Sequence, residues 1–171
     1  MTDRKLFGTN TLIDDFLQRL TKIETVGGGW STKYLDNETG RYWLKYTVDD
    51  RGFFQNLMLI SPPPTTDELI ELAFTSEYPD EVSAAARRLC IEEQTDKKEF
   101  RQKLTDRLNE VNLSRLEQRG KERIKIIIQA SEITDGVNKR DIVGKHFTEI
   151  QKDADFFKTV SDNARRILRS L

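Results

Sequence analysis

The chain has 171 residues and a formal net charge of −1, with 36% hydrophobic and 33% charged residues. This composition is sufficient for a hydrophobic core and argues against a disordered chain, so we expect one compact domain or a small β element fused to a helical one. The one cysteine excludes an internal disulfide, and the one histidine leaves a zinc site or a Ser–His–Asp triad without enough partners. No apolar run approaches the roughly 20 residues of a membrane span, and residues 1–5 do not begin a signal peptide, which predicts a cytoplasmic protein without a membrane partner.

The charge is unevenly distributed along the chain. Residues 27–100 carry 8 Lys and Arg against 14 Asp and Glu, whereas residues 101–171 carry 16 against 11. An acidic region of this kind would attract a basic partner and repel nucleic acid. Ordinary solvated helix faces would give the same counts, so both interpretations stay open.

The first predicted element is an amphipathic helix over residues 10–26, because apolar residues recur there at helical spacing. The three glycines at 27–29 would end this helix. Three glycines can also indicate a phosphate-binding loop. Here, however, they would follow a helix and precede a strand, and no Lys-Ser/Thr comes after them, so we expect no nucleotide cofactor.

A β-hairpin is predicted next, with strands over residues 30–35 and 41–48, which are rich in aromatic and β-branched residues. Residues 36–40 between them have the composition of a turn, with glycine at the end. A second turn at 49–52 leads into a third strand over 53–60. Together these segments predict a three-stranded antiparallel meander backed by the first helix.

Three prolines at 62–64 predict a boundary between a helix-plus-meander region, 1–61, and an α-helical region, 62–171. Helices are expected to begin near Thr65, with a capping box to Glu68, and near Pro79. Further helices are expected over about 100–111, 115–131, 139–151 and 154–170. The predicted fold class is therefore α+β, with the helices forming a HEAT-like array or a plain bundle.

A short internal sequence repeat favours the HEAT-like array. The segment 82–90 reads VSAAARRLC and returns at 160–168 as VSDNARRIL, each time after a predicted helix. Residues 67–90 and 145–168 resemble HEAT-type helical repeats, in which small alanines let neighbouring helices approach closely. Stacked helix pairs usually hold partners rather than transform substrates.

The sequence shows no clear catalytic, metal-binding or nucleic-acid-binding motif. Cys90 lies on an apolar helix stripe with no histidine near it in sequence, which predicts a buried structural thiol. Adjacent acids such as Asp49 and Asp50 would point to opposite faces of a strand and are poorly placed to act as a catalytic pair. Basic residues between Arg115 and Lys125 are diluted by glutamates and lack interleaved aromatics, which argues against nucleic-acid binding. We therefore expect no enzyme, no catalytic residue, no metal ligand and no cofactor.

A protein partner is the remaining class of ligand. Exposed Trp and Tyr beside acids are typical of interaction hot spots, and a small meander buries only one face well. Coverage of both faces by the helical region is the alternative. The candidate partner-binding residues are Trp30, Tyr34, Asp36, Glu38, Tyr42, Trp43, Asp49 and Asp50.

The hairpin also carries a family resemblance. Residues 30–46 read WSTKYLDNETGRYWLKY, and the Thr-Gly-Arg-Tyr-Trp core at 39–43 resembles a motif of immunity proteins from bacterial polymorphic toxin systems. Membership would imply an immunity protein that binds and neutralises a cognate toxin. We expect occlusion of the toxin's active site as the mechanism, with the acids Asp36, Glu38, Asp49 and Asp50 steering a basic toxin domain. A helical-repeat adaptor or scaffold with a protein partner is the alternative function.

Overall fold

The computed structural model describes residues 4–49 and 51–171. Within these ranges five antiparallel strands form one sheet with the order β1-β5-β4-β3-β2. The strands are β1 Leu6–Phe7, β2 Leu20–Val26, β3 Ser31–Asp36, β4 Arg41–Thr47 and β5 Gln55–Leu59. The predicted three-stranded meander is matched in part: β3, β4 and β5 follow one another as expected, but β1 and β2 add a strand at each edge that the sequence did not predict.

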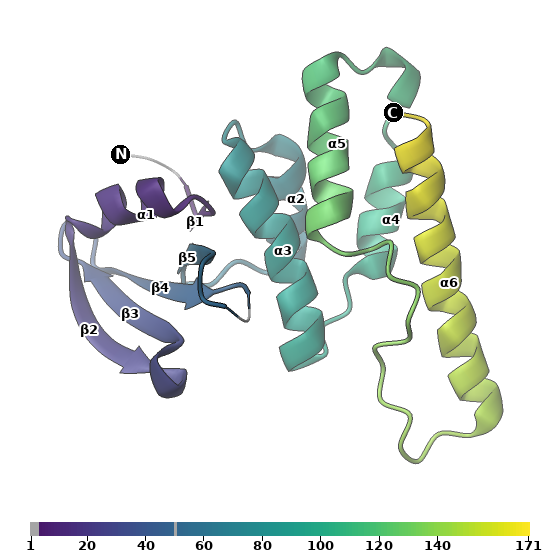
Figure 1. The fold of residues 1–171 in the computed structure, drawn as a ribbon, viewed down its shortest axis with the longest axis horizontal. Helices are drawn as coiled ribbons and strands as arrows, with labels where there is room; N and C mark the ends of the chain where they lie inside the picture. Colours follow the sequence, from purple (N-terminus) through teal and green to yellow (C-terminus); the bar gives the residue numbers. More distant parts are fainter. Residues whose placement is uncertain (1–3, 50) are drawn as a thin grey trace.

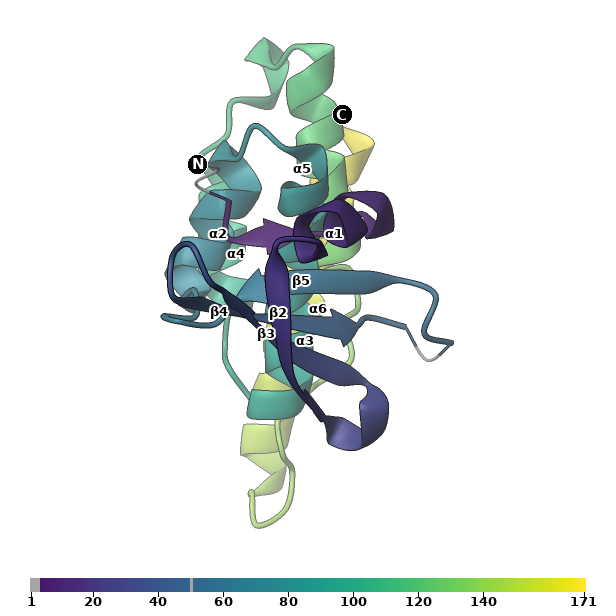
Figure 2. The same cartoon turned by 90° about the vertical axis from the view of Figure 1, so that its left-hand side faces the viewer.

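The helices lie mainly on one side of this sheet. They are α1 Asn10–Leu17, α2 Thr66–Thr75, α3 Pro79–Asp96, α4 Arg101–Asn109, α5 Gln118–Ala130 and α6 Phe147–Arg169. Figure 1 shows α3 between the sheet and the outer helices α4, α5 and α6. Seen from the side of the sheet, the strands lie in front and the helical layer behind them (Figure 2). The fold is thus mixed α and β, as predicted in outline.

The predicted helix over 10–26 is wrong in its second half. The helix ends at Leu17, and the chain continues as β2, which pairs with β3 from Leu20 to Val26. Four of the seven β2 residues are β-branched and favour an extended backbone. The glycines do not end a helix: Gly27, Gly28 and Gly29 have positive φ angles of 61°, 67° and 101° and make the tight connection from β2 to β3.

The helical region begins as predicted. Thr65 Oγ1 accepts the N–H of Glu68 at 3.2 Å, and the Glu68 carboxylate accepts the N–H of Thr65 at 2.8 Å, which completes the capping box of α2. Pro79 occupies the first turn of α3. The boundary at 62–64 falls between β5 and α2, but it does not divide the core. One hydrophobic cluster joins Leu6 and Met58 of the sheet to Val82 of α3 and to the helices behind it.

The two helices predicted over 139–151 and 154–170 are a single helix, α6, which starts after His146 with its own capping box to Glu149. No glycine or proline interrupts residues 147–169, so nothing stops the helix near 152. The second copy of the sequence repeat, at 160–168, therefore lies inside one long helix rather than at the end of a helix pair. The HEAT-type resemblance stays a prediction.

A second, smaller cluster lies on the other face of the sheet. There α1 packs Ile13 and Phe16 against Phe7, Trp43 and Leu57. Adjacent strand residues point to opposite faces, so Trp43 faces α1 whereas Leu44 and Tyr46 of β4 face the helical layer. Both faces of β4 and β5 are covered in this way. At the edge of the sheet β2 stays exposed from Thr21 to Val26.

Candidate interaction surfaces

The sequence-predicted partner residues lie in three separate places on the sheet. Trp30 and Asp49 lie at the end where β3 begins and β4 finishes, while Glu38 lies in the turn at the opposite end. A strand rise of 3.3 Å per residue separates the two ends by about 16 Å. Tyr34 and Trp43 are paired across the middle of β3 and β4. Asp50 lies outside the described residues.

Two of the predicted residues are buried. Trp43 is 3% exposed, and its ring lies 4.9 Å from the Phe16 ring under α1. Asp36 is 1% exposed and shapes the β3–β4 turn, because its carboxylate accepts the N–H of Glu38 and lies 3.5 Å from Arg19. The folded chain does not offer these side chains to a partner. Sequence alternation placed aromatics on both faces of β4 but could not show that α1 covers one of them.

The other predicted side chains that the structure describes are at least partly accessible. Tyr34 is half-buried beside α1, where burial raises the pKa of its phenol and Asp14 adds to the effect. Tyr42 and Glu38 are exposed near the β3–β4 turn, and Lys33 Nζ lies 4.7 Å from the Tyr42 ring. These residues form no continuous patch with Trp30.

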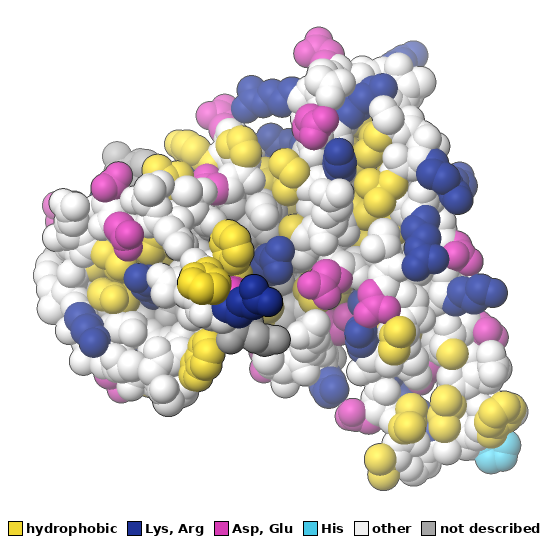
Figure 3. Space-filling model, viewed as in Figure 1, with side chains coloured by type: hydrophobic (Ala, Val, Ile, Leu, Met, Phe, Trp, Pro, Cys, Tyr) yellow, Lys and Arg dark blue, Asp and Glu magenta, His cyan; other side chains and the backbone are white. Residues whose placement is uncertain are grey.

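Three exposed rings gather at the far end of the sheet, and we call them the aromatic tip: Trp30, Phe53 and Phe54. They are 54%, 67% and 66% exposed. Trp30 follows the β2–β3 connection and the phenylalanines lie in the β4–β5 loop, where a Cβ on Gly52 would lie 4.0 Å from the indole. Figure 3 shows hydrophobic side chains around a Lys or Arg side chain over this loop.

Hydrogen bonds brace the aromatic tip from below. Asp49 accepts the N–H of Phe54 at 2.8 Å and that of Phe53 at 3.4 Å. Asn10 Nδ2 donates to the Phe53 carbonyl at 2.9 Å, and the Val48 N–H donates to the Phe54 carbonyl at 3.0 Å. The loop is therefore anchored to α1 and β4. Asp49 was predicted to steer a partner, but its carboxylate is engaged in holding the loop.

Sequence reasoning found Trp30 but missed the two phenylalanines, which it assigned to a strand beginning at 53. The strand begins at Gln55. A usable signal was present, because adjacent strand residues point to opposite faces, and a meander that buries only one face well would leave one of the two phenylalanines exposed.

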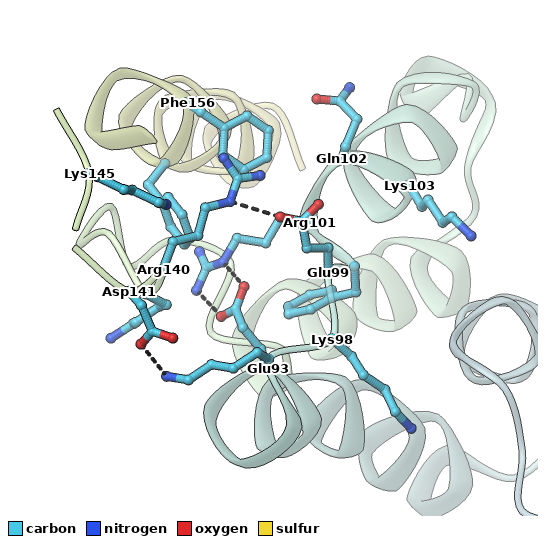
Figure 4. A pocket seen from close by; sticks show the side chains of 14 residues that line it. Glu93, Lys98, Glu99, Arg101, Gln102, Lys103, Arg140, Asp141, Lys145 and Phe156 are labelled. Atoms are coloured by element: carbon cyan, nitrogen blue, oxygen red, sulfur yellow. Dashed lines mark hydrogen bonds and ion pairs between the residues drawn. The ribbon is translucent and has the colours of Figure 1, made fainter. Parts of the chain in front are cut away.

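A second candidate surface is a cavity of about 730 Å³, which we call the α3–α6 cleft. Its walls come from the end of α3, the start of α4, residues 139–145 and α6 (Figure 4). The lining residues are Glu93, Lys97, Lys98, Glu99, Phe100, Arg101, Gln102, Lys103, Lys139, Arg140, Asp141, Lys145, Phe156 and Phe157. Seven are basic, three are acidic and three are phenylalanines, which gives a cationic cleft with an aromatic floor.

Ion pairs organise one wall of the cleft. Arg140 Nη1 lies 2.6 Å from Asp153, and Lys145 Nζ lies 2.7 Å from the same carboxylate. Hydrogen bonds from Lys145 and Arg140 hold the pKa of Asp153 below its ordinary value. Burial alone would lower the pKa of Arg140, but Asp153 and Glu99 raise it above the ordinary value. Arg140 is thus a permanent cation on the cleft wall.

A third exposed group lies beside the cleft. Val137, Ile142, Val143 and Phe147 are each more than half exposed, and Val143 reaches 93%. They belong to the segment before α6 and to its first residue. Figure 3 shows hydrophobic side chains at this lower end of the molecule. Sequence reasoning placed three of these residues, Ile142, Val143 and Phe147, in a helix over 139–151, and α6 begins only at Phe147, so their exposure was not foreseen.

In the part of the chain that the structure describes, no three His, Cys, Asp or Glu side chains are grouped as a metal site requires. Among the same residues no helix combines the length and the apolar character needed to cross a membrane. Comparison of the chain with protein-family models, curated proteins and solved structures finds no match.

Proposed function

We propose that the protein binds a protein partner through the aromatic tip, and that it acts as an immunity-type protein that neutralises a cognate bacterial toxin by occlusion. The observation that carries this proposal is the exposure of Trp30, Phe53 and Phe54, the two phenylalanines lying on a loop that hydrogen bonds hold in place. Large aromatic side chains dominate the energy of interfaces, and an exposed cluster of them is uncommon on a monomer. Because hydrogen bonds hold the loop backbone, binding would cost little conformational entropy.

The motif that resembles immunity proteins overlaps this surface. It begins with Trp30 at the tip and runs through β3 and β4. The loop that follows β4 then supplies the phenylalanines. The toxin-neutralising form of the proposal rests on this resemblance, whereas the binding surface rests on the exposed rings alone.

The proposed mechanism is stoichiometric. The rings would insert into apolar pockets beside the toxin's active site, and the surrounding chain would cover the site and exclude substrate. The excess of acids over residues 27–100 favours a basic partner. No residue of the chain takes part in a chemical step in this mechanism.

Co-expression with the product of the adjacent gene tests the proposal, which requires that product to be the toxin. The wild-type chain should rescue growth and form a 1:1 complex. Trp30→Ala and Phe54→Ala should each weaken the complex by about 30-fold or more, the effect of losing a hot-spot residue. Tyr42→Ala is the matched control, because this exposed aromatic lies at the other end of the sheet. Absence of rescue, or equal affinities for all three variants, would contradict the proposal.

The adaptor function is the alternative, and the exposed side chains before α6 favour it. A partner held by the helical region would contact Ile142, Val143 and Phe147 rather than the tip. Val143→Ser, at a side chain with almost no contacts to lose, would then abolish binding and Trp30→Ala would not. The immunity-type proposal requires the opposite pattern.

A further inference from the structure

The α3–α6 cleft has the dimensions of a small-molecule site. Its volume of about 730 Å³ falls in the range of roughly 300–1,000 Å³ that ligand pockets occupy. Figure 4 shows Arg140 and Lys145 on one side, Gln102 and Lys103 on the other, and the Arg101–Glu93 pair between them. The two sides come from chain segments about 40 residues apart, so the fold assembles the cleft.

The apolar part of the cleft is aromatic. Phe156 and Phe157 meet edge to face, with ring centroids 5.5 Å apart and planes at 89°. The Arg140 guanidinium lies over the Phe156 ring, with Cζ 4.7 Å from the centroid. A flat apolar body entering the cleft would find a ring and a stacked guanidinium to pack against.

Glu99 shows where the acidic group of a ligand could bind, because its own carboxylate already occupies that position. Its carboxylate lies 2.8 Å from Arg140 Nε, and its side chain is 71% exposed. It precedes the first turn of α4, whose N-cap, Phe100, makes no side-chain hydrogen bond, so the positive end of the helix faces this region. An ion pair this exposed is weak, so an external anion can replace Glu99 at small cost.

The rim of the cleft adds positive charge. Lys97, Lys98 and Lys103 keep about half of their side chains exposed. The partner of Lys98 is the buried Glu92, while Lys97 and Lys103 pair with exposed acids. Glu92 also pairs with Arg88, whose Nε lies 2.9 Å from its carboxylate, so a bound anion would gain from these ammonium groups without leaving a buried carboxylate unpaired.

We propose that the α3–α6 cleft binds a small aromatic organic anion, whose acidic group takes the place of the Glu99 carboxylate beside Arg140 and whose ring packs against Phe156. This site is separate from the aromatic tip and does not depend on the proposed toxin partner. Carboxylates, sulfonates and phosphate monoesters share the required chemistry, because each presents paired oxygens to a guanidinium.

Titration of the full chain with 8-anilinonaphthalene-1-sulfonate, followed by fluorescence and calorimetry, tests the proposal. One saturable site is expected. Glu99→Gln should tighten binding by up to about fivefold, because it removes the competing carboxylate. Arg140→Gln should weaken binding at least tenfold. Lys125→Glu is the control, since it changes an exposed lysine on α5 outside the cleft.

Three further measurements distinguish this site from other ways of binding the dye. The uncharged analogue N-phenyl-1-naphthylamine should bind at least tenfold more weakly, while 2-naphthoate and 1-naphthyl phosphate should displace the dye. Phe54→Ser should leave the affinity unchanged, because the tip is a separate surface. The proposal is overturned if the uncharged analogue binds equally well, if Glu99→Gln and Arg140→Gln match the wild type, or if Phe54→Ser removes the dye site.

Discussion

Arg101 and Glu93 form a two-pronged ion pair in the interior of the helical layer. Arg101 Nε lies 2.7 Å from Glu93 Oε1 and Nη2 lies 2.9 Å from Oε2, and the arginine is 2% exposed. Nη1 also donates to the Asp135 carbonyl at 2.8 Å, and the guanidinium lies 4.8 Å from the centre of the Phe157 ring. The Arg101 side chain, which belongs to α4, therefore connects this helix with α3, with α6 and with the segment that follows α5.

Arg101→Ala should destabilise the chain strongly. The change leaves the Glu93 carboxylate without its cation in a nearly dry site, which costs about 3–5 kcal/mol of the free energy of unfolding. Urea denaturation followed by circular dichroism measures the loss. Arg101→Ala combined with Glu93→Ala should recover part of it, since the second change removes the uncompensated charge. A loss below about 1 kcal/mol in the single variant would show that the pair is not a structural centre.

Local sequence chemistry predicted the elements whose causes are local. The turn at 36–40, the Thr65 capping box and the Pro79 helix start each depend on residues within four positions of one another. The region 20–26 was misassigned because Leu20 and Ile23 also fit a helical stripe, and only pairing with β3 selects the strand. Two helices were predicted in place of the single helix α6, because the internal sequence repeat was interpreted as a two-helix unit.

The candidate surfaces were less predictable than the fold. Trp30 and Trp43 look equivalent in the sequence, yet one is 54% and the other 3% exposed, because α1 covers only the second. The cleft brings Glu99 within 2.8 Å of Arg140 across 41 positions. No spacing rule relates residues so far apart, so this contact could not be derived from one sequence.

Asp49 gives a test of how the aromatic tip is held. Asp49→Asn keeps an oxygen that can accept the Phe54 N–H, whereas Asp49→Ala removes it and should cost about 1 kcal/mol per lost hydrogen bond. Hydrogen exchange of the Phe54 amide should be faster in the alanine variant and nearly unchanged in the asparagine variant. Equal exchange rates in both variants would mean that other contacts hold the loop.

The same pair of variants separates loop support from steering. If Asp49 acts through the loop, Asp49→Asn should associate with the partner at the wild-type rate at low and high salt. A rate that falls at low salt in Asp49→Asn would instead restore the steering role, since long-range attraction is screened by ions.

The lowered pKa of the Glu68 carboxyl predicts that the stability of the chain depends on pH in the acid range. Hydrogen bonds from Lys5 and from Thr65 lower the pKa of its carboxyl from 4.5 to about 2. Because the folded chain favours the charged form, this contribution is complete above pH 4.5 and is lost as the pH falls toward 2. Unfolding free energies between pH 2 and 7 should therefore fall less steeply on the acid side in Glu68→Gln. Lys5→Ala should flatten the curve similarly, and an unchanged curve in both variants would refute the assignment.

Cys90 should be an unreactive thiol in the folded chain. It is 4% exposed on α3, and burial raises the pKa of its thiol from 9.0 to about 12, with Glu132 adding to the effect. Since only the thiolate is nucleophilic, a shift of this size reduces the reactive fraction near pH 8 by roughly 1,000-fold. Iodoacetamide labelling followed by mass spectrometry should be slow in buffer and complete within minutes in 6 M urea, about the rate of a free thiol. Ser83→Cys provides the control at a half-buried position of the same helix, and rapid labelling of Cys90 in buffer would show that α3 opens locally.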